Sequence, residues 1–158
     1  MPTAGVLPVN DFAIWSEVIP GASGQTGNSC ILATEVNATN YTSLRFNGSF
    51  FFAKGIGGVS YQLFANYNTL KDTPFQYQAF QSRVYGMGIR VKQQGGNWSA
   101  WALKNDADGR LDVPVGTTYQ IGARSNVSHF AGYYPGLLIA AHADPKAYLE
   151  SLTTKYGV

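Results

Sequence analysis

Few residues of this sequence have the types and spacing that catalysis or metal binding requires. The two histidines, His129 and His142, lie far apart, and neither begins an H-x-x-x-H pair of the kind that holds zinc. The single cysteine, Cys30, opens the apolar run 30–33 and is expected to be a small buried side chain. The sequence has no nucleophile elbow, phosphate-binding loop or dinucleotide-binding glycine pattern. We therefore expect no catalytic residues and no cofactor.

The closest resemblance to a metal site is the run 105–109, which places Asn105, Asp106 and Asp108 before a glycine. A calcium loop of the EF-hand type begins with an oxygen ligand and carries a glutamate after its glycine. Here the residue at the first position is Lys104, a cation, and no glutamate stands at the required place. A β-turn uses the same Asp and Gly residues, so we expect a turn without a metal.

Aromatic residues offer a different chemistry, because rings on a flat surface can form a platform for sugars. Trp98, Trp101, Tyr133 and Tyr134 are the candidates. If 97–104 is a strand, the two tryptophans face opposite sides of the sheet, so one belongs to the core. Tyr133 and Tyr134 precede Pro135 and are expected on an exposed loop.

The composition favours a protein that binds other proteins. Charged residues make up 13% of the 158 residues and aromatic residues 14%. Surfaces that bind partners are poor in lysine and glutamate and rich in aromatic side chains. The net charge is +2 without a cluster of Lys and Arg, so we expect no nucleic-acid binding. No apolar run reaches the roughly 18–20 residues of a membrane span. The first residues do not resemble a signal peptide, so we expect a soluble chain made in the cytoplasm.

Alternating apolar and polar residues predict a series of short strands. Residues 1–11 lack this alternation and contain Pro2 and Pro8, so they predict an extended arm that contributes to attachment and not to the fold. The clearest alternation lies at 111–123, with odd-numbered residues such as Ile121 toward the core, and the apolar run 136–141 predicts a central strand. Further strands are expected at 12–19, 30–36, 41–54 with a turn or bulge at Asn47-Gly48, 59–67, 75–92 as one or two strands, and 97–104.

The C-terminal residues have a different period. Asp144 and Pro145 are typical of a helix start, and Gly157 of a helix end. Tyr148, Leu149, Leu152 and Tyr156 recur at helical spacing, which predicts one short helix at 145–156. The sequence therefore predicts an all-β domain at 12–158, a jelly roll or β-sandwich, preceded by the arm 1–11 and closed by this helix.

The whole chain resembles, in style, the small accessory proteins of bacteriophage virions. The features that carry the resemblance are the Pro/Gly arm, a β domain of low charge rich in Tyr, Gln, Asn and Gly, and the short C-terminal helix. Capsid decoration (cement) proteins with jelly-roll domains are the most similar group, although no specific motif links the sequence to them. The resemblance implies a non-enzymatic homotrimer, located in the virion, that binds the major capsid protein or another virion protein.

Two residue groups are the candidate partner-binding residues, Val6, Leu7 and Pro8 in the arm and Tyr133 and Tyr134 before Pro135. The alternative function is a secreted or cell-surface lectin-like β-sandwich that binds carbohydrate. Five glycosylation sequons leave this alternative open, at Asn37, Asn40, Asn47, Asn97 and Asn126.

Overall fold

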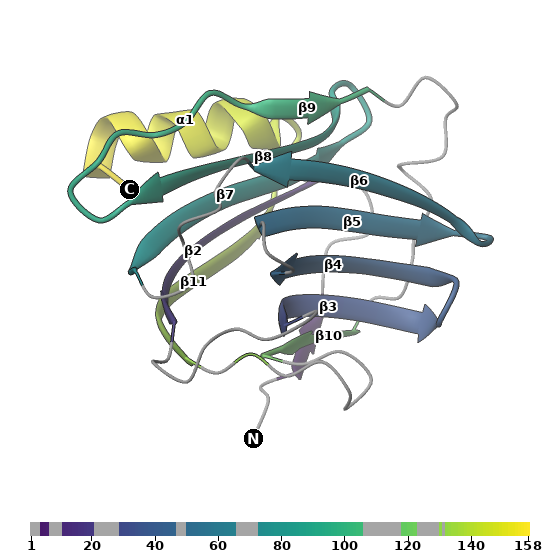
Figure 1. Ribbon diagram of the computed structural model, residues 1–158. Coiled ribbons are helices and arrows are strands. Elements are labelled where there is room, and N and C mark those ends of the chain that lie inside the picture. Colours follow the sequence, from purple (N-terminus) through teal and green to yellow (C-terminus); the bar gives the residue numbers. More distant parts are fainter. Residues whose placement is uncertain are drawn as a thin grey trace.

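The computed structural model describes residues 4–6, 11–20, 29–46, 50–65, 73–105, 118–122, 130 and 132–158. These residues form β-strands and a C-terminal helix (Figure 1). In chain order the elements are β1 (Ala4–Val6), β2 (Phe12–Pro20), β3 (Ser29–Asn37), β4 (Asn40–Phe46), β5 (Phe50–Ile56), β6 (Val59–Ala65), β7 (Phe75–Ser82), β8 (Gly86–Gln93), β9 (Ala102–Lys104), β10 (Thr118–Ile121), β11 (Gly132–Ala141) and α1 (Pro145–Tyr156).

The strands form two antiparallel sheets. One has the order β1-β10-β3-β4-β5-β6, and the other the order β11-β2-β7-β8-β9. Strands β3 to β6 follow one another as hairpins because the turns suit tight reversal. Gly57 and Gly58 between β5 and β6 have φ of 57° and 88°, which a two-residue type I′ turn requires. Phe46 of β4 pairs with Phe50 of β5, and the turn or bulge predicted at Asn47-Gly48 lies outside the described residues. The all-β, jelly-roll or β-sandwich prediction is confirmed.

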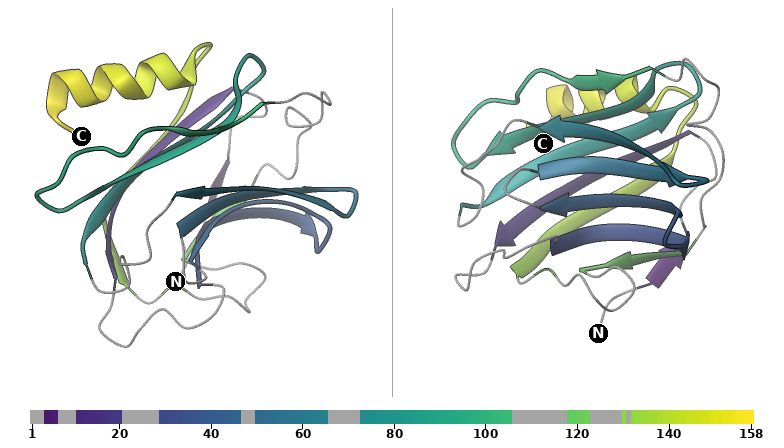
Figure 2. Two further views of the ribbon diagram at one scale, coloured as in Figure 1. Left: turned by 45° about the horizontal axis from the view of Figure 1, so that its top comes forward. Right: turned by 45° about the vertical axis from the view of Figure 1, so that its right-hand side comes forward.

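The core lies between the two sheets, where alternate residues of each strand point inward. Figure 2 shows the sheets as two facing layers, with α1 on the outer side of the five-stranded sheet. Burial is complete or nearly so for the large side chains between the layers, among them Ile14, Leu44, Phe50, Phe52, Phe75, Tyr77, Met87, Ile89 and Val91. The core therefore needs no disulfide or metal to hold it together.

The helix α1 has the bounds predicted from the sequence. Asp144 Oδ1 accepts a hydrogen bond from the Ala147 backbone N–H at 3.0 Å, which satisfies one unpaired donor of the first turn. Gly157 adopts φ 72° and donates its N–H to the Thr153 carbonyl, which ends the helix. Leu149 is fully buried and packs with Ala13 and Phe80 on the outer face of the five-stranded sheet.

The arm prediction needs a correction. Ala4–Val6 form β1, which pairs with β10 through Ala4 and Gln120, Gly5 and Tyr119, and Val6 and Thr118. This part of residues 1–11 therefore belongs to the six-stranded sheet. A strand needs no apolar period of its own when backbone hydrogen bonds attach it to an edge, so the sequence pattern did not reveal it.

Three other strand predictions also change. The run 136–141 belongs to β11, which among the described strands lies at the edge of its sheet and not at the centre. In 97–104 only Ala102–Lys104 form a strand, so the alternation rule does not apply to Trp98 and Trp101. Of 111–123, Thr118–Ile121 form β10, while residues 111–117 lie outside the described part. Tyr119 packs against the core as expected for the odd face, but Ile121 is only partly buried.

Candidate functional site

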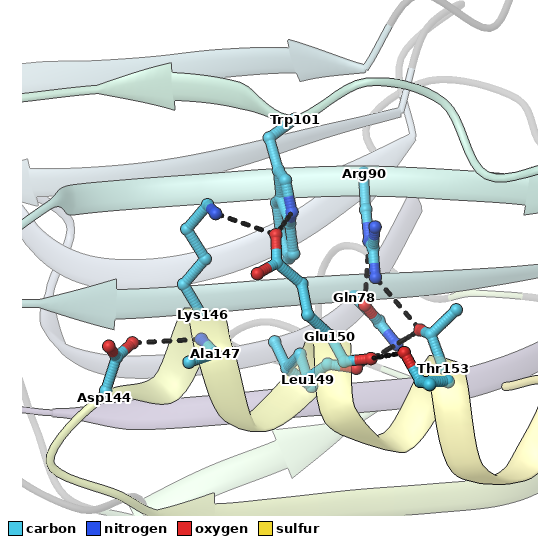
Figure 3. Close-up of polar contacts among 10 residues, drawn as sticks. Gln78, Arg90, Trp101, Asp144, Lys146, Ala147, Leu149, Glu150 and Thr153 are labelled. Atoms are coloured by element: carbon cyan, nitrogen blue, oxygen red, sulfur yellow. Dashed lines mark hydrogen bonds and ion pairs between the residues drawn. The ribbon is translucent and has the colours of Figure 1, made fainter.

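Gln78 joins α1 to the five-stranded sheet (Figure 3). Its side chain is fully buried on β7, facing the helix. Its Nε2 lies within hydrogen-bond distance of three acceptors, the carbonyl oxygens of Leu149 (3.3 Å) and Val158 (3.1 Å) and the hydroxyl of Thr153 (2.9 Å). Its Oε1 accepts a hydrogen bond from Arg90 Nε at 2.8 Å. One amide thus connects two strands with the end of the helix.

Arg90 lies between two indole rings. Its Cζ is 4.8 Å from the centre of the Trp98 ring and 4.6 Å from that of Trp101. Its Nη2 donates to Thr153 Oγ1 at 3.0 Å. Burial lowers the pKa of Arg90 below its ordinary value, and the negative charge of Glu150 opposes this shift. Because the guanidinium is occupied by these contacts, we interpret it as a residue that positions α1 and not as one that binds a substrate.

Glu150 completes the network from the helix side. Its Oε1 accepts hydrogen bonds from Trp101 Nε1 at 3.0 Å and from Lys146 Nζ at 2.7 Å. Burial by itself would raise the pKa of Glu150. The hydrogen bonds from Lys146 and Trp101 and the positive charges of Lys146 and Arg90 outweigh burial, so this pKa lies below its ordinary value. The carboxylate therefore stabilises the folded state in its charged form.

The substitution Glu150→Gln should lower the melting temperature at neutral pH and have no effect in acid. A carboxyl with a lowered pKa contributes stability above its unfolded pKa of about 4.3, and this stability is lost as the pH falls through the folded pKa. The Glu150 side chain is 42% exposed, so solvent screening limits the contribution to about 1 kcal/mol or less. Thermal unfolding of both proteins at about pH 7 and about pH 3 measures this. A difference that grows in acid would contradict the assignment.

A polar row crosses the same outer face beyond the end of α1. We define it as Glu17 on β2, Gln76 on β7 and Lys92 on β8, which are direct cross-strand partners. The three residues line a hollow of about 160 Å³ together with Pro74 and the turn 93–95. These three residues were not predictable from the sequence, because no local signal indicates that residues so far apart in the chain share one row.

Two buried polar atoms beside the row have no hydrogen-bond partner in the described part of the chain, namely Gln76 Oε1 and Trp98 Nε1. Trp98 lies next to Lys92, whose Nζ is 6.0 Å from the centre of the indole ring. Lys92 Nζ also donates to the Gly157 carbonyl at 2.7 Å. An ammonium carries three protons, so Lys92 can donate further. The row therefore presents both acceptors and donors.

The structure separates the residues predicted to bind partners. Tyr133 and Tyr134 lie in β11 and not in a loop, because Pro135 is tolerated on an edge strand where the register with β2 shifts. The Tyr133 side chain is 73% exposed. Tyr134 instead packs against the core and Phe130, at 5.2 Å between ring centres. Val6 lies in β1, and Leu7 and Pro8 lie outside the described part.

Tyr134 is consequently a core residue. Burial raises the pKa of its phenol well above the ordinary value, and the nearby Tyr77 and Cys30 raise it further. Burial has the same effect on the pKa of Tyr77, and the nearby Ser16 side chain opposes it only in part. Both phenols therefore stay neutral at physiological pH. Only Tyr133 of the pair is available to a partner.

The second half of β11 is an apolar strand segment. The segment 136–141 (Gly-Leu-Leu-Ile-Ala-Ala) pairs in regular register with β2 on one side, and β11 is the last strand of its sheet in the described part of the chain. It contains no charge and no proline. Lysine, proline and bulges are the usual devices that prevent an edge strand from pairing with another chain. Here Pro135 and the register shift protect only the beginning of β11.

The histidine and cysteine side chains that could take part in catalysis or metal binding make structural contacts instead. His142 Nδ1 accepts a hydrogen bond from the Asp144 backbone N–H at 3.1 Å, and its ring stacks on Tyr148. Cys30 is fully buried, and its thiol lies 3.4 Å from the Leu32 carbonyl oxygen. Within the described residues, no group of three His, Cys, Asp or Glu side chains is placed to hold a metal ion. His129 and residues 106–109 lie outside them. No described helix is long and apolar enough to cross a membrane.

Comparison with known proteins identifies the fold but no family. No family model and no curated protein matches the sequence. The enzymatically active domain of tailspike protein 2 of bacteriophage CBA120 superposes with a TM-score of 0.69 at 11% identity, over 98% of this chain and 25% of that one. Domains LG4-5 of the mouse laminin alpha1 chain give 0.58 at 16% identity, over 88% and 38%. The native heptameric SAP-like pentraxin from Limulus polyphemus gives 0.56 at 14% identity, over 88% and 69%.

At these identities the similarity concerns the fold alone. The chain spans only a quarter of the tailspike chain and about two fifths of the laminin chain. All three support a jelly-roll or β-sandwich architecture. A phage tailspike is among the similar structures, whereas the comparisons found no sequence-level evidence for a capsid decoration protein.

Proposed function

We propose that this chain is a non-enzymatic structural protein of a virus particle that binds the capsid shell as a homo-oligomer. The observation that carries the proposal is the unguarded edge 136–141 of β11, beside the exposed Tyr133. Such an edge offers a row of backbone donors and acceptors to a second strand. The low charge of the sequence and the similarity of fold to a phage tailspike domain support the proposal.

The occupant of the β11 edge is a second copy of this chain. The segment 136–141 carries no charge, so copies meet there without like-charge repulsion. A strand paired with its own copy gives a two-fold dimer, whereas β11 against a different edge of the next copy closes a ring. We propose the ring with three subunits, as the resemblance to decoration proteins implies. Several attachment points per particle then strengthen binding to the capsid protein without a tighter single contact.

The substitution Leu138→Lys tests the edge, because lysine is a natural guard against edge pairing. Leu138 lies in the middle of the unguarded segment and pairs with Trp15 of β2. The control is Val36→Lys on β3, an interior strand of the other sheet, where Val36 is 64% exposed. Sedimentation velocity should show an oligomer for the original protein and for Val36→Lys. It should show the 17.1 kDa monomer for Leu138→Lys.

Different results would contradict self-association, the role of β11, the trimer and the virion role separately. A monomeric original protein contradicts self-association, and an oligomeric Leu138→Lys protein contradicts the role of β11. A dimer contradicts the trimer. The virion role is tested by mass spectrometry of purified particles, where the chain should be present in a fixed ratio to the major capsid protein. Its absence from particles contradicts the virion role, whatever its oligomeric state.

A further inference from the structure

We propose that the polar row Glu17, Gln76 and Lys92 is a binding subsite for a neutral sugar residue of a glycan. Carbohydrate binding was the alternative function expected from the sequence, but the aromatic platform suggested for it does not form. Trp98 and Trp101 both face Arg90, and Tyr133 lies on β11. The polar row is a separate place, on the outer face of the five-stranded sheet, and its use is independent of the β11 edge.

The hollow has the size of one sugar residue. The hollow over the row measures about 160 Å³. That volume corresponds to about five water molecules at roughly 30 Å³ each, and it is below the 300 Å³ or more of typical sites for larger ligands. Pro74 and the turn 93–95 form its walls, so a group the size of one sugar ring fills it.

Gln76 provides unsatisfied polar chemistry beside the hollow. Its Oε1 is a buried acceptor without a partner in the described chain, and the residue borders the hollow, so a turn of the side-chain amide presents this acceptor to a bound group. Buried polar groups of this kind destabilise a protein unless something binds them, so an unpaired one beside a hollow favours a bound polar group. Lys92 supplies donors on the other side of Gln76, and Trp98 lies next to Lys92.

The charges of the polar row and its alternation of donors and acceptors favour a neutral ligand. Glu17 and Lys92 carry opposite charges on either side of Gln76, so the row is neutral as a whole. An anion such as phosphate would meet the Glu17 carboxylate, and an apolar group would leave Gln76 Oε1 unpaired. Neighbouring hydroxyls of a sugar each donate and accept a hydrogen bond, which matches acceptors and donors arranged in one row.

The test is a titration of the free, isotope-labelled protein with glucose, galactose, mannose and N-acetylglucosamine, followed by amide and indole NMR signals. At least one sugar should shift the Gln76 side-chain amide and the Trp98 indole signals in a saturable way. The expected Kd is on the order of 1 mM, as for a small, shallow site. Gln76→Ala and Glu17→Gln should each weaken this binding about tenfold, the effect of one lost hydrogen bond.

The matched control is Gln62→Ala, since Gln62 is exposed on β6 of the other sheet. It should leave sugar binding unchanged. Glu17→Gln keeps the size of the side chain, so it remains informative if Gln76→Ala does not fold. The proposal is overturned if none of the four sugars gives saturable shifts, which would assign the hollow to ordered water only. It is also overturned if Glu17→Gln binds as tightly as the original protein. Neither result affects the sedimentation test of β11.

Discussion

Gln78→Ala should destabilise the protein by about 3 kcal/mol, because truncation leaves several buried groups unpaired at about 1–3 kcal/mol each. The removed amide serves Arg90 on one side and the last turn of α1 on the other. No nearby side chain can replace it, since Gln78 is fully buried between sheet and helix. The effect should reach the helix first, and α1 should lose protection against hydrogen exchange before the core strands do.

Urea unfolding of the original protein, Gln78→Ala and Gln62→Ala measures the loss. Gln62 is exposed on β6, so the same substitution there should change the free energy of unfolding by no more than about 0.5 kcal/mol. Equal effects from the two substitutions would contradict the role assigned to Gln78. Unchanged hydrogen exchange in α1 would show that the helix is held by Leu149 and its apolar neighbours instead.

Phe50→Ala should destabilise the protein further, by about 3–5 kcal/mol, the range for removing a buried aromatic ring. Phe50 is fully buried between the sheets, with its ring centre 5.5 Å from that of Phe75 and 5.1 Å from that of Tyr77. These tilted ring contacts add to the loss of buried area. The cavity would open where β5 faces the other sheet, so neither layer could close over it without moving the other.

The matched control for Phe50 is Phe64→Ala. Phe64 lies on β6, beside β5, but is 51% exposed. Its truncation should cost about 0.5 kcal/mol or less, as surface substitutions usually do. Denaturant midpoints for both variants give the comparison. A small loss for Phe50→Ala would mean that the two sheets can collapse over the missing ring, against the close packing described here.

The sequence predicted those elements whose signals are local. The helix 145–156 was placed correctly because its cap, its first proline and its final glycine lie within the helix ends themselves. The strands 12–19 and 59–67 were placed to within two residues because each alternates over its own length, and 30–36 because it is a short apolar run after a loop-forming segment. Pairing partners were not predictable in this way, since a period of two says which residues share a face and not which strand lies next.

The wrong strand predictions have the same cause, since the pattern of a strand does not identify its neighbours in the sheet. The run 136–141 indicated a central strand because both its faces are apolar, but β11 is an edge strand with the core on one side and Trp15 on the other. Pro135 indicated a loop because proline interrupts most strands, yet the edge tolerates it. The network of Gln78, Arg90 and Thr153 and the polar row were not predictable, because each joins strands or a helix that only the fold brings together.

The order of the strands has a kinetic consequence. Strands β3 to β6 are neighbours in both sequence and sheet, so their hairpins can form in about 1–10 μs each. The five-stranded sheet instead needs β2 beside β11, where the Ser16 hydroxyl donates to the Gly136 carbonyl across 120 positions of the chain. Such distant closures are slow. We therefore expect the β3–β6 meander to form early during synthesis and to wait, with its apolar inner face uncovered, until residues 132–141 emerge. That interval is when the nascent chain is most prone to aggregate.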